Sequence, residues 1–419
     1  MAKLGRPSRS TVLNGLKWTA ASVVGLQTAS IMAVVAVDEL RKRREPPSGS
    51  FPSLKPQTAQ VSDSDVTVYT NGHDLYEDQL RAIRGAKQNV FFECYIVKAD
   101  EIGYAFRREL IKAARRGVQV HVILDMFGNL NQDPRYRHFP KIDNLHVIRF
   151  PLVRLGILTG RAKDTGRDHR KVLTVDGEIG FVGGYNIGTL YANHWRDTHV
   201  RVVGPQVWDL ENSFVDMWNM FRKRNQPMLP DQGAHEWSPR LRAVTNTPAF
   251  KLFPVRASYL DAIDRATERV WITMGYFIPD EGFLHSLVSA AKRGVDVRVL
   301  IPQYSNHILA DWVGRPHYSA LLNGGVRIFL YREAMVHAKT MTVDGRWSTV
   351  GTTNIDRLSM AGNYEINLEL FDTDFAAIME RVFNVDMSNS IELDRDVWEM
   401  RPSINRVVER VLRPLAPLL

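Results

Sequence analysis

The sequence has little cysteine, and its long middle has little net charge. Cys94 is the single cysteine, which excludes an internal disulfide framework and a cysteine-based metal cluster. The net charge of +8 gathers at the ends: residues 1–45 carry +5 and residues 395–419 carry +2, which leaves about +1 for the rest. A nucleic-acid-binding protein is expected to carry basic charge on its working domain. The distribution therefore argues against nucleic acid as a partner.

The N-terminal segment, residues 1–45, contains a long stretch without charge. From Trp18 to Val37 no residue is charged over 20 positions, which is about 30 Å as a helix, or one hydrocarbon core. The basic run Arg41–Arg44 follows, as expected for a stop-transfer flank. We therefore predict a transmembrane helix here. The alternatives are a secretory signal peptide and a buried or interfacial helix.

The C-terminal segment, residues 395–419, has an amphipathic pattern. One face of a predicted helix carries apolar residues, and three arginines lie elsewhere on it; the apolar residues are Ile404, Val407, Val408, Val411 and Leu412, and the arginines are Arg406, Arg410 and Arg413. Two interpretations stay open: a terminal helix packed on the body, or a surface helix lying on anionic lipid.

Between the ends, the same order of elements occurs twice. "LYEDQLRAIRGAKQNVFFECYIV" parallels "ASYLDAIDRATERVWITMGYFI", each predicting an amphipathic helix and then an apolar strand. "ELIKAARRGVQVHVILD" parallels "SLVSAAKRGVDVRVLIP", each predicting a helix closed by Gly117 or Gly294 and then a buried strand. The pattern indicates an internal duplication of α/β layers with largely parallel strands. We place the domains at 61–225 and 249–394, with Pro/Ser-rich and polar linkers at 46–60 and 226–248.

A polar motif is also repeated. "HRKVLTVDGEIGFVGGYN" begins at His169 and "HAKTMTVDGRWSTVGTTN" begins at His337. Strand alternation puts the imidazole and the lysine two residues later on one face, which gives the pairs His169 with Lys171 and His337 with Lys339. Small residues and an asparagine follow in each copy; they are Gly183, Gly184 and Asn186, then Gly351, Thr352 and Asn354. A base or nucleophile, a cation and an amide donor on one surface suit a tetrahedral anion such as phosphate.

Carboxylates repeat with the same offset. Asp197 lies 28 residues after His169, and Glu365 lies 28 residues after His337. We expect each carboxylate to accept a proton from the imidazole of its own copy, which fixes the tautomer and prepares the other nitrogen for chemistry. Asp176 and Asp344 end their strands before a glycine. For these two aspartates, two interpretations stay open: each either stabilises the turn after its strand or takes a direct part in catalysis.

With these motifs, the sequence resembles the phospholipase D superfamily. The resemblance rests on the two His-x-Lys-x4-Asp motifs with their Gly-x-x-Asn tails, and it extends over roughly residues 65–390. Three flanking segments are most similar to the sequences of bacterial cardiolipin synthases; they are "NHWRDTHVRVVGP", "YFIPDE" and "NYEINLEL". Gly184 departs from the family, which usually has serine there, so a phosphate contact from that hydroxyl is lost in the first half.

The resemblance implies a fold and a mechanism. Two phospholipase D-like domains pair about a pseudo-two-fold axis, and His169 and His337 face one phosphorus atom. His169 attacks and forms a phosphohistidine, while His337 acts as acid and then as base. Lys171, Lys339, Asn186 and Asn354 hold the phosphate oxygens, with small residues Gly184 and Thr352 beside them. Neither a metal nor a cofactor is required.

The resemblance also implies substrates and a location. We expect a phosphatidyltransferase of the bacterial cell membrane that makes cardiolipin from two phosphatidylglycerols and releases glycerol. A hydrolytic phospholipase D giving phosphatidic acid, a phosphodiesterase or nuclease of the same superfamily, and a non-catalytic lipid-binding scaffold are the alternatives. The loop 149–171 is either an ordinary surface loop or a lid that meets acyl chains and headgroups; its basic residues are Arg154, Arg161, Lys163 and Arg167, and its apolar residues are Leu152, Val153, Leu155, Ile157 and Leu158.

Overall fold

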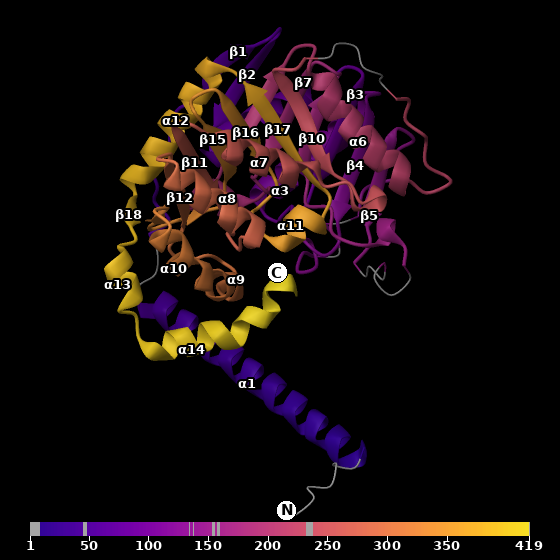
Figure 1. Cartoon of the computed structure of the whole chain (residues 1–419). Coiled ribbons are helices and arrows are strands. Elements are labelled where there is room, and N and C mark those ends of the chain that lie inside the picture. Colours follow the sequence, from indigo (N-terminus) through magenta and orange to yellow (C-terminus); the bar gives the residue numbers. More distant parts are fainter. Residues whose placement is uncertain are drawn as a thin grey trace, which may run out of the picture.

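The structure is a computed structural model, and it describes residues 9–44, 48–133, 135–136, 138–152, 156, 160–231 and 238–418. Two α/β domains follow each other along the chain, each built on one eight-stranded sheet (Figure 1). The first sheet has the order β1-β2-β9-β7-β6-β3-β4-β5, and the second has the order β10-β17-β16-β15-β11-β12-β13-β18. When the first sheet is followed from β2 and the second from β10, the strands occur in the same order relative to the chain. This shared topology confirms the predicted duplication.

The strands of the first sheet are β1 (Gln57–Val61), β2 (Ser64–Tyr69), β3 (Asn89–Cys94), β4 (Gln119–Asp125), β5 (Leu145–Phe150), β6 (Lys171–Val175), β7 (Ile179–Gly183) and β9 (His199–Val203). Those of the second are β10 (Leu241–Asn246), β11 (Arg269–Met274), β12 (Asp296–Pro302), β13 (Arg327–Tyr331), β15 (Lys339–Val343), β16 (Trp347–Gly351), β17 (Glu365–Phe371) and β18 (Ser390–Glu392). Two short strands, β8 (Trp195–Arg196) and β14 (Met335–Val336), pair with each other across the domains.

The helices of the first domain are α2 (Gly72–Gly85), α3 (Glu101–Arg115), α5 (Thr189–His194) and α6 (Val207–Phe221), with the 3-10 turn η1 (Ala162–Asp164). Those of the second are α7 (Pro254–Arg265), α8 (Glu281–Lys292), α9 (Ile308–Gly314), α10 (Pro316–Asn323), α11 (Arg357–Ala361) and α12 (Thr373–Ser388), with η2 (Pro248–Phe250) before them. The terminal helices are α1 (Arg9–Arg44), α13 (Arg395–Glu399), α14 (Ser403–Leu412) and η3 (Arg413–Leu418).

The repeated helix-strand units form as predicted. Asp100 and Asp280 cap the starts of α3 and α8 by accepting a hydrogen bond from a backbone N–H two residues into each helix. Gly117 and Gly294 follow their ends with φ of 99° and 92°, a conformation that favours glycine. The strands β4 and β12 then run parallel to β3 and β11.

The prediction of largely parallel sheets is wrong, because both sheets are mixed. Only β3-β4-β5 and β11-β12-β13 run parallel, and the neighbouring strands pair antiparallel. One cause is the Asp-Gly pair at the end of each motif. Asp176 and Gly177 have φ of 55° and 67°, and Asp344 and Gly345 have φ of 52° and 61°. Two successive positive φ values make a tight hairpin turn, so β7 and β16 fold straight back on β6 and β15.

The two domains share an apolar core where their sheets meet. Valines of β6, β7 and β9 (Val172, Val182, Val200) lie in one buried cluster with residues of β16 and β17 (Val350, Ile366, Leu368). Each sheet is covered on its other surfaces by its own helices: α2 and α3 on one face and α6 on the other in the first domain, and α7, α8 and α10 opposite α12 in the second. The strands that carry the repeated motifs therefore lie beside the interface.

Both predicted linkers contain strands. Residues 57–60 were expected in the linker 46–60, but they belong to the edge strand β1 (Gln57–Val61), in which Ala59 and Val61 are buried. Leu241–Asn246 was expected in the linker 226–248, but it is β10, paired along its length with β17. Alternate burial over five or six residues is too short a signal to stand out in segments rich in proline and polar residues.

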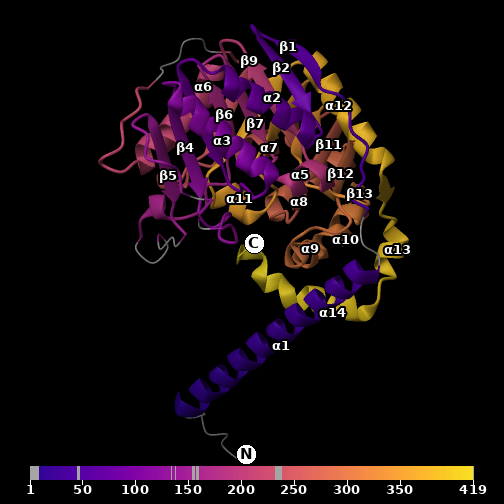
Figure 2. The ribbon, with the colours of Figure 1, turned by 180° about the vertical axis from the view of Figure 1, so that it is seen from behind.

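Residues 18–37, for which a transmembrane helix was predicted, do form part of the long helix α1, which projects from the body (Figures 1 and 2). Among the described residues, however, no helix is long and apolar enough to cross a membrane. Ser22, Gln27, Thr28 and Ser30 lower the mean hydropathy of this stretch. From Gln27 onward, one face of α1 packs against α14 and α9, with Val34 buried beside Val313 and Leu412.

Candidate active site

The two histidines are each held by the main chain of the opposite domain. His169 donates its backbone N–H to the carbonyl oxygen of Tyr364 at 3.0 Å, and His337 donates to that of Arg196 at 2.7 Å. The strand pair β8–β14 and the bridge between Asp168 and Tyr364 continue these contacts. The contacts are reciprocal, as expected for two domains related by a pseudo-two-fold axis.

The imidazole–carboxylate pairs also cross between the domains. His169 Nδ1 lies 2.9 Å from Oε2 and 3.1 Å from Oε1 of Glu365. His337 Nδ1 lies 2.7 Å from Oδ2 of Asp197. The prediction that each histidine uses the carboxylate of its own copy is therefore wrong. Asp197 comes directly after β8, which pairs with the strand just before His337, so the topology delivers this carboxylate to the other domain.

Thr352 and Gly184 support these carboxylates. The Thr352 hydroxyl donates to Glu365 Oε2 at 2.5 Å and accepts from the N–H of Ile366 at 3.0 Å. At the matching place in the first domain, a Cβ on Gly184 would lie 2.0 Å from Asp197 Oδ1. The two positions were predicted to lie beside the phosphate. Instead, the structure puts them behind the carboxylates: Thr352 orients Glu365, and Gly184 makes room for Asp197.

The two lysines are buried and point back to the histidines. Lys171 donates from Nζ to the carbonyl oxygen of His169 at 2.7 Å, and Lys339 donates to that of His337. Their exposed fractions are 2% and 0%. Burial lowers the pKa of both ammonium groups, and for Lys339 it lowers the pKa to about 7. An anion bound beside them would restore their charge.

The titratable groups of both motifs influence one another. Burial is the main reason that the pKa of His337 lies well below its usual range, and the charges of Lys339 and Lys171 lower it further. Burial also lowers the pKa of His169, against the opposing effect of Glu365. Burial raises the pKa of Asp197 to about 6. The crossed contacts of His169 with Glu365 and of His337 with Asp197 join both motifs in one cluster.

Asn186 and Asn354 are held in equivalent ways. The side-chain oxygen of Asn186 accepts from the N–H of Ile96 at 3.2 Å, and that of Asn354 accepts from the N–H of Tyr276 at 3.3 Å. An amide oxygen fixed by a backbone donor orients the amide NH₂ group as well. Both asparagines are buried next to their motif, so each can present two N–H donors to an anion.

Asp176 and Asp344 lie away from this cluster. Each is at the far end of its strand from the lysine, roughly 17 Å along the chain. Asp176 accepts from the backbone N–H groups of residues 87–89, and Asp344 accepts from those of residues 267–269, at 2.8 to 2.9 Å. These contacts support the turn interpretation: both aspartates fasten the hairpin to the start of the neighbouring strand.

Three aromatic rings next to the histidines were not predicted. Tyr95 contacts His169 with ring centroids 4.9 Å apart, and Trp195 and Tyr276 contact His337 at 4.8 and 5.7 Å. Lys171 lies over the Tyr95 ring and Lys339 over the Tyr276 ring, with Nζ 5.3 and 6.0 Å from the ring centres. Tyr95 directly follows β3, whereas Tyr276 is the second residue after β11 and matches Ile96 of the first domain, so the duplication does not pair the two tyrosines.

Arg196 is a second missed residue, and its role is in the interface. Its guanidinium is fully buried and makes two hydrogen bonds of 2.8 Å to the carboxylate of Asp386 on α12. This bidentate pair joins the first domain to the second, directly beside Asp197. Removing one partner would leave a buried charge without its counterion.

Part of the predicted lid, residues 153–155 and 157–159, falls outside the described residues. Val153, Arg154, Leu155, Ile157 and Leu158 belong to that part. Leu152, Arg161 and Lys163 are exposed. Arg167 donates to the carbonyl oxygen of Pro151 at 2.9 Å and lies over the ring of Phe127.

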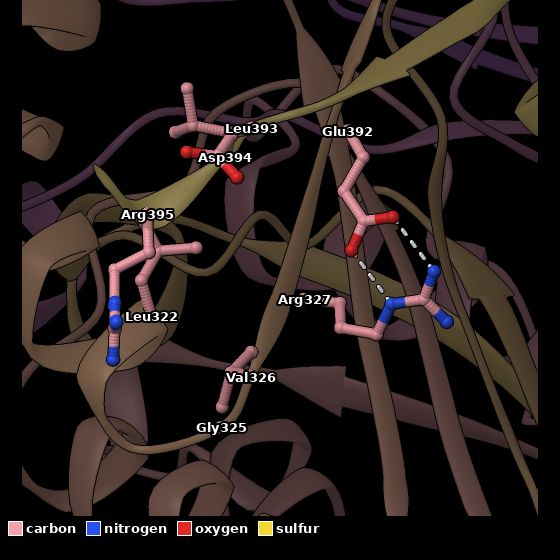
Figure 3. A pocket seen from close by; sticks show the side chains of 8 residues that line it. All are labelled: Leu322, Gly325, Val326, Arg327, Glu392, Leu393, Asp394 and Arg395. Atoms are coloured by element: carbon pink, nitrogen blue, oxygen red, sulfur yellow. Dashed lines mark hydrogen bonds and ion pairs between the residues drawn. The ribbon is translucent and has the colours of Figure 1, made fainter. Parts of the chain in front are cut away.

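A hollow elsewhere in the second domain has no part in this cluster. It lies at the sheet edge formed by β13 and β18, where Arg327 and Glu392 pair through two hydrogen bonds of 2.8 and 2.7 Å (Figure 3). β11 and β12 lie between this edge and β15. Its charged groups include an ion pair that is already satisfied, and no histidine lines it.

The fold and the cluster together define a class of protein. Two similar mixed α/β domains meet at an apolar interface and bring two His–Lys pairs, with crossed carboxylates, to one place. This arrangement is that of the phospholipase D-like enzymes.

Comparisons with known proteins narrow the class. The family model described as "Cardiolipin synthase, PLD-like domain" matches residues 80–218 and 259–387. A cardiolipin synthase of Staphylococcus aureus (strain N315) is 30% identical over 369 residues, covering 86% of this chain and 74% of that protein. A cardiolipin synthase of Geobacillus kaustophilus (strain HTA426) is 32% identical over 367 residues, covering 85% and 72%. The chain belongs to the phospholipase D-like cardiolipin synthase family.

A solved structure shares the fold. The phosphatidylserine synthase of Haemophilus influenzae Rd KW20 superposes with a TM-score of 0.66 at 14% identity, covering 90% of this chain and 97% of that one. The likeness spans both domains.

Proposed function

We propose that this enzyme is a phosphatidyltransferase that makes cardiolipin from two phosphatidylglycerols and releases glycerol. The observation that carries the proposal is the pair of crossed imidazole–carboxylate contacts. Both carboxylates accept at Nδ1, so Nε2 of each ring is left for chemistry, and two buried lysines stand beside the rings. Family membership provides the reaction class.

The substrate phosphodiester is the first group to bind. It carries one negative charge, and the ammonium groups of Lys171 and Lys339 supply two positive charges nearby. Burying these two charges without an anion costs free energy, so a bound phosphodiester stabilises them. The amide groups of Asn186 and Asn354 add N–H donors. These cations and donors stabilise the charge that develops on the non-bridging oxygens, so no step of the proposal uses a metal.

His169 is the nucleophile in this proposal. Its Nε2 forms a bond to phosphorus, the bond from phosphorus to the glycerol oxygen breaks, and Nε2–H of His337 gives its proton to that oxygen. One observation favours this assignment: the His169 side chain is 12% exposed while that of His337 is 4% exposed, so the His169 ring is the more accessible to a substrate phosphorus atom.

The second half of the reaction resolves the phosphohistidine. His337, now neutral, takes the proton of the acceptor hydroxyl, the acceptor oxygen bonds to phosphorus, and the bond to His169 Nε2 breaks. A second phosphatidylglycerol gives cardiolipin, whereas water gives phosphatidic acid. One phosphodiester replaces another in the first case, so the local concentration of the lipid alcohol favours transfer. This places the enzyme at a membrane surface, which we propose is that of the bacterial cell membrane.

Two experiments test the proposal. The protein is incubated with phosphatidylglycerol labelled in the phosphate, and the lipids are separated. Cardiolipin with glycerol is expected; phosphatidic acid with glycerol would show a hydrolase instead. Second, His169→Ala and His337→Ala are each expected to abolish turnover, and only His337→Ala is expected to accumulate labelled phosphoenzyme. Near-normal turnover by either variant would refute the shared site.

A further inference from the structure

Helix α14 carries its apolar side chains on one broad face, and the body covers only part of that face. Val408 and Leu412 pack inward against Val34 of α1 and Val313 of α9. On the outer side, Ile404 and Val407 are 65% and 52% exposed. Exposed apolar residues that lie together on one helix indicate a contact with something outside the chain.

The charge around this outer stripe has one sign. Arg406 and Arg410 of α14 are exposed, and so is Arg413, which directly follows the helix. Glu409, the one acidic residue of α14, is buried and paired with Arg401 at 2.9 Å. The outer surface of α14 is therefore apolar and positively charged.

The apolar surface continues onto the helix beside it. α1 packs along α14, with the Gln27 amide donating to the carbonyl oxygen of Val411 at 3.5 Å. The side of α1 that faces away from the body exposes Leu26, Met32 and Val37 at 55%, 67% and 62%. From Gly25 to Val37 this helix has no charged residue.

We propose that the outer face of α14, together with the exposed side of α1, is a docking surface for an anionic phospholipid bilayer. α14 would lie in the headgroup region, with Ile404 and Val407 toward the acyl chains and the three arginines among the phosphates. The choice of a lipid surface over a second copy follows from the charge. A two-fold contact through this face would bring two arginine-rich stripes together, and like charges oppose it. The inference rests on the proposed function only for the lipid nature of the substrate.

α14 packs against α9, and the residues just before α9 lie next to the histidine cluster. Two residues just before α9 contact Tyr276: Asn306 accepts from its hydroxyl at 2.7 Å, and the ring of His307 lies 5.3 Å from its ring. Tyr276 in turn contacts His337. The bilayer surface would thus lie against the elements that surround the reacting groups, which shortens the path of a lipid headgroup to them.

The test compares full-length variants in binding to extruded vesicles. The double variant Ile404→Asp/Val407→Asp removes the exposed apolar side chains of α14, and Arg406→Gln/Arg410→Gln removes two of its positive charges. Phe371→Asp is the matched control, because Phe371 is an apolar residue that is 49% exposed at the end of β17, away from α14. Vesicles are either phosphatidylcholine with phosphatidylglycerol or phosphatidylcholine alone. Each α14 variant is expected to bind the anionic vesicles roughly tenfold more weakly than the parent and the control. The residual binding of the aspartate variant should fall with salt, and that of the glutamine variant should depend on salt less.

Turnover in detergent–lipid mixed micelles separates docking from chemistry. The α14 variants should keep kcat at saturating lipid and raise the apparent KM. Melting temperatures and gel filtration accompany the assay. Unchanged vesicle binding by folded α14 variants would refute the proposed docking surface. A parent protein that forms no cardiolipin would instead refute the proposed function. A parent that is dimeric, with α14 variants that are monomeric, would assign this face to a second copy and also refute the inference.

Discussion

Gly184 allows a direct test of how Asp197 positions His337, the general acid of the proposed mechanism. In the structure, an added Cβ would lie 2.0 Å from Oδ1 and 2.7 Å from Cγ of Asp197. Ordinary contact begins near 3.4 Å, so the carboxylate has to retreat by about 1.4 Å. Retreat breaks the 2.7 Å contact with His337. The carboxylate is also held by the N–H of Thr198 at 2.7 Å, which leaves it little freedom to adapt.

The Gly184→Ala variant is therefore expected to lose activity more than stability. A displacement of about 1 Å at a positioned group costs on the order of 100-fold in rate. Overpacking of one methyl costs about 1–3 kcal/mol of folding free energy. Cardiolipin formation is measured as kcat in mixed micelles, with thermal melting beside it. Gly85→Ala is the control, because no atom lies within 4 Å of its Cβ position.

A double-mutant cycle identifies the cause. If Gly184→Ala acts only through Asp197, it costs nothing further once Asp197→Ala has been made, so the double variant should match Asp197→Ala within about twofold. Two results would refute the reasoning: a Gly184→Ala enzyme within threefold of the parent, or a double variant far slower than Asp197→Ala.

Three further predictions follow from the site. First, kcat/KM should fall as pH rises through about 7, because Lys339 loses its proton there in the free enzyme. The fall of kcat should occur at a higher pH, because a bound phosphate favours the charged form of Lys339. Lys339→Arg should remove the fall of kcat/KM near pH 7, and a fall of kcat and kcat/KM at the same pH would contradict this prediction. Second, Glu365→Gln should block phosphoenzyme formation, while Asp197→Asn should slow its resolution by lipid alcohol, which rapid-quench labelling measures; the reverse pattern would exchange the roles of the two histidines. Third, Asp176→Ala should lower the free energy of unfolding by about 1–3 kcal/mol yet keep kcat at low temperature, as urea titration and assay would show; a large loss of kcat in a folded variant would return Asp176 to the chemistry.

Much of the fold followed from local patterns. Helical periodicity, apolar runs for the strands, and the glycines Gly117 and Gly294 after two of the helices are local features, and each gave the correct element. The antiparallel hairpins also had a local signal in Asp176-Gly177 and its repeat, but the expectation of parallel strands from helix–strand alternation outweighed it.

The site was predicted in its members but not in its pairing. The histidines, the lysines and the two carboxylates follow from matching offsets. Which carboxylate meets which imidazole depends on β8 and β14, two-residue strands that pair between domains and leave no periodic trace in the sequence. For the same reason, Thr352 was read as a phosphate neighbour: its contact with Glu365 becomes visible only when β16 and β17 are side by side.

The crossed pairing of His169 with Glu365 and of His337 with Asp197 makes the two repeats depend on each other. Each imidazole takes its carboxylate from the other repeat, so a single repeat on its own would hold neither pair. The repeats differ in the residue behind the carboxylate: glycine stands beside Asp197 in one, and threonine stands beside Glu365 in the other.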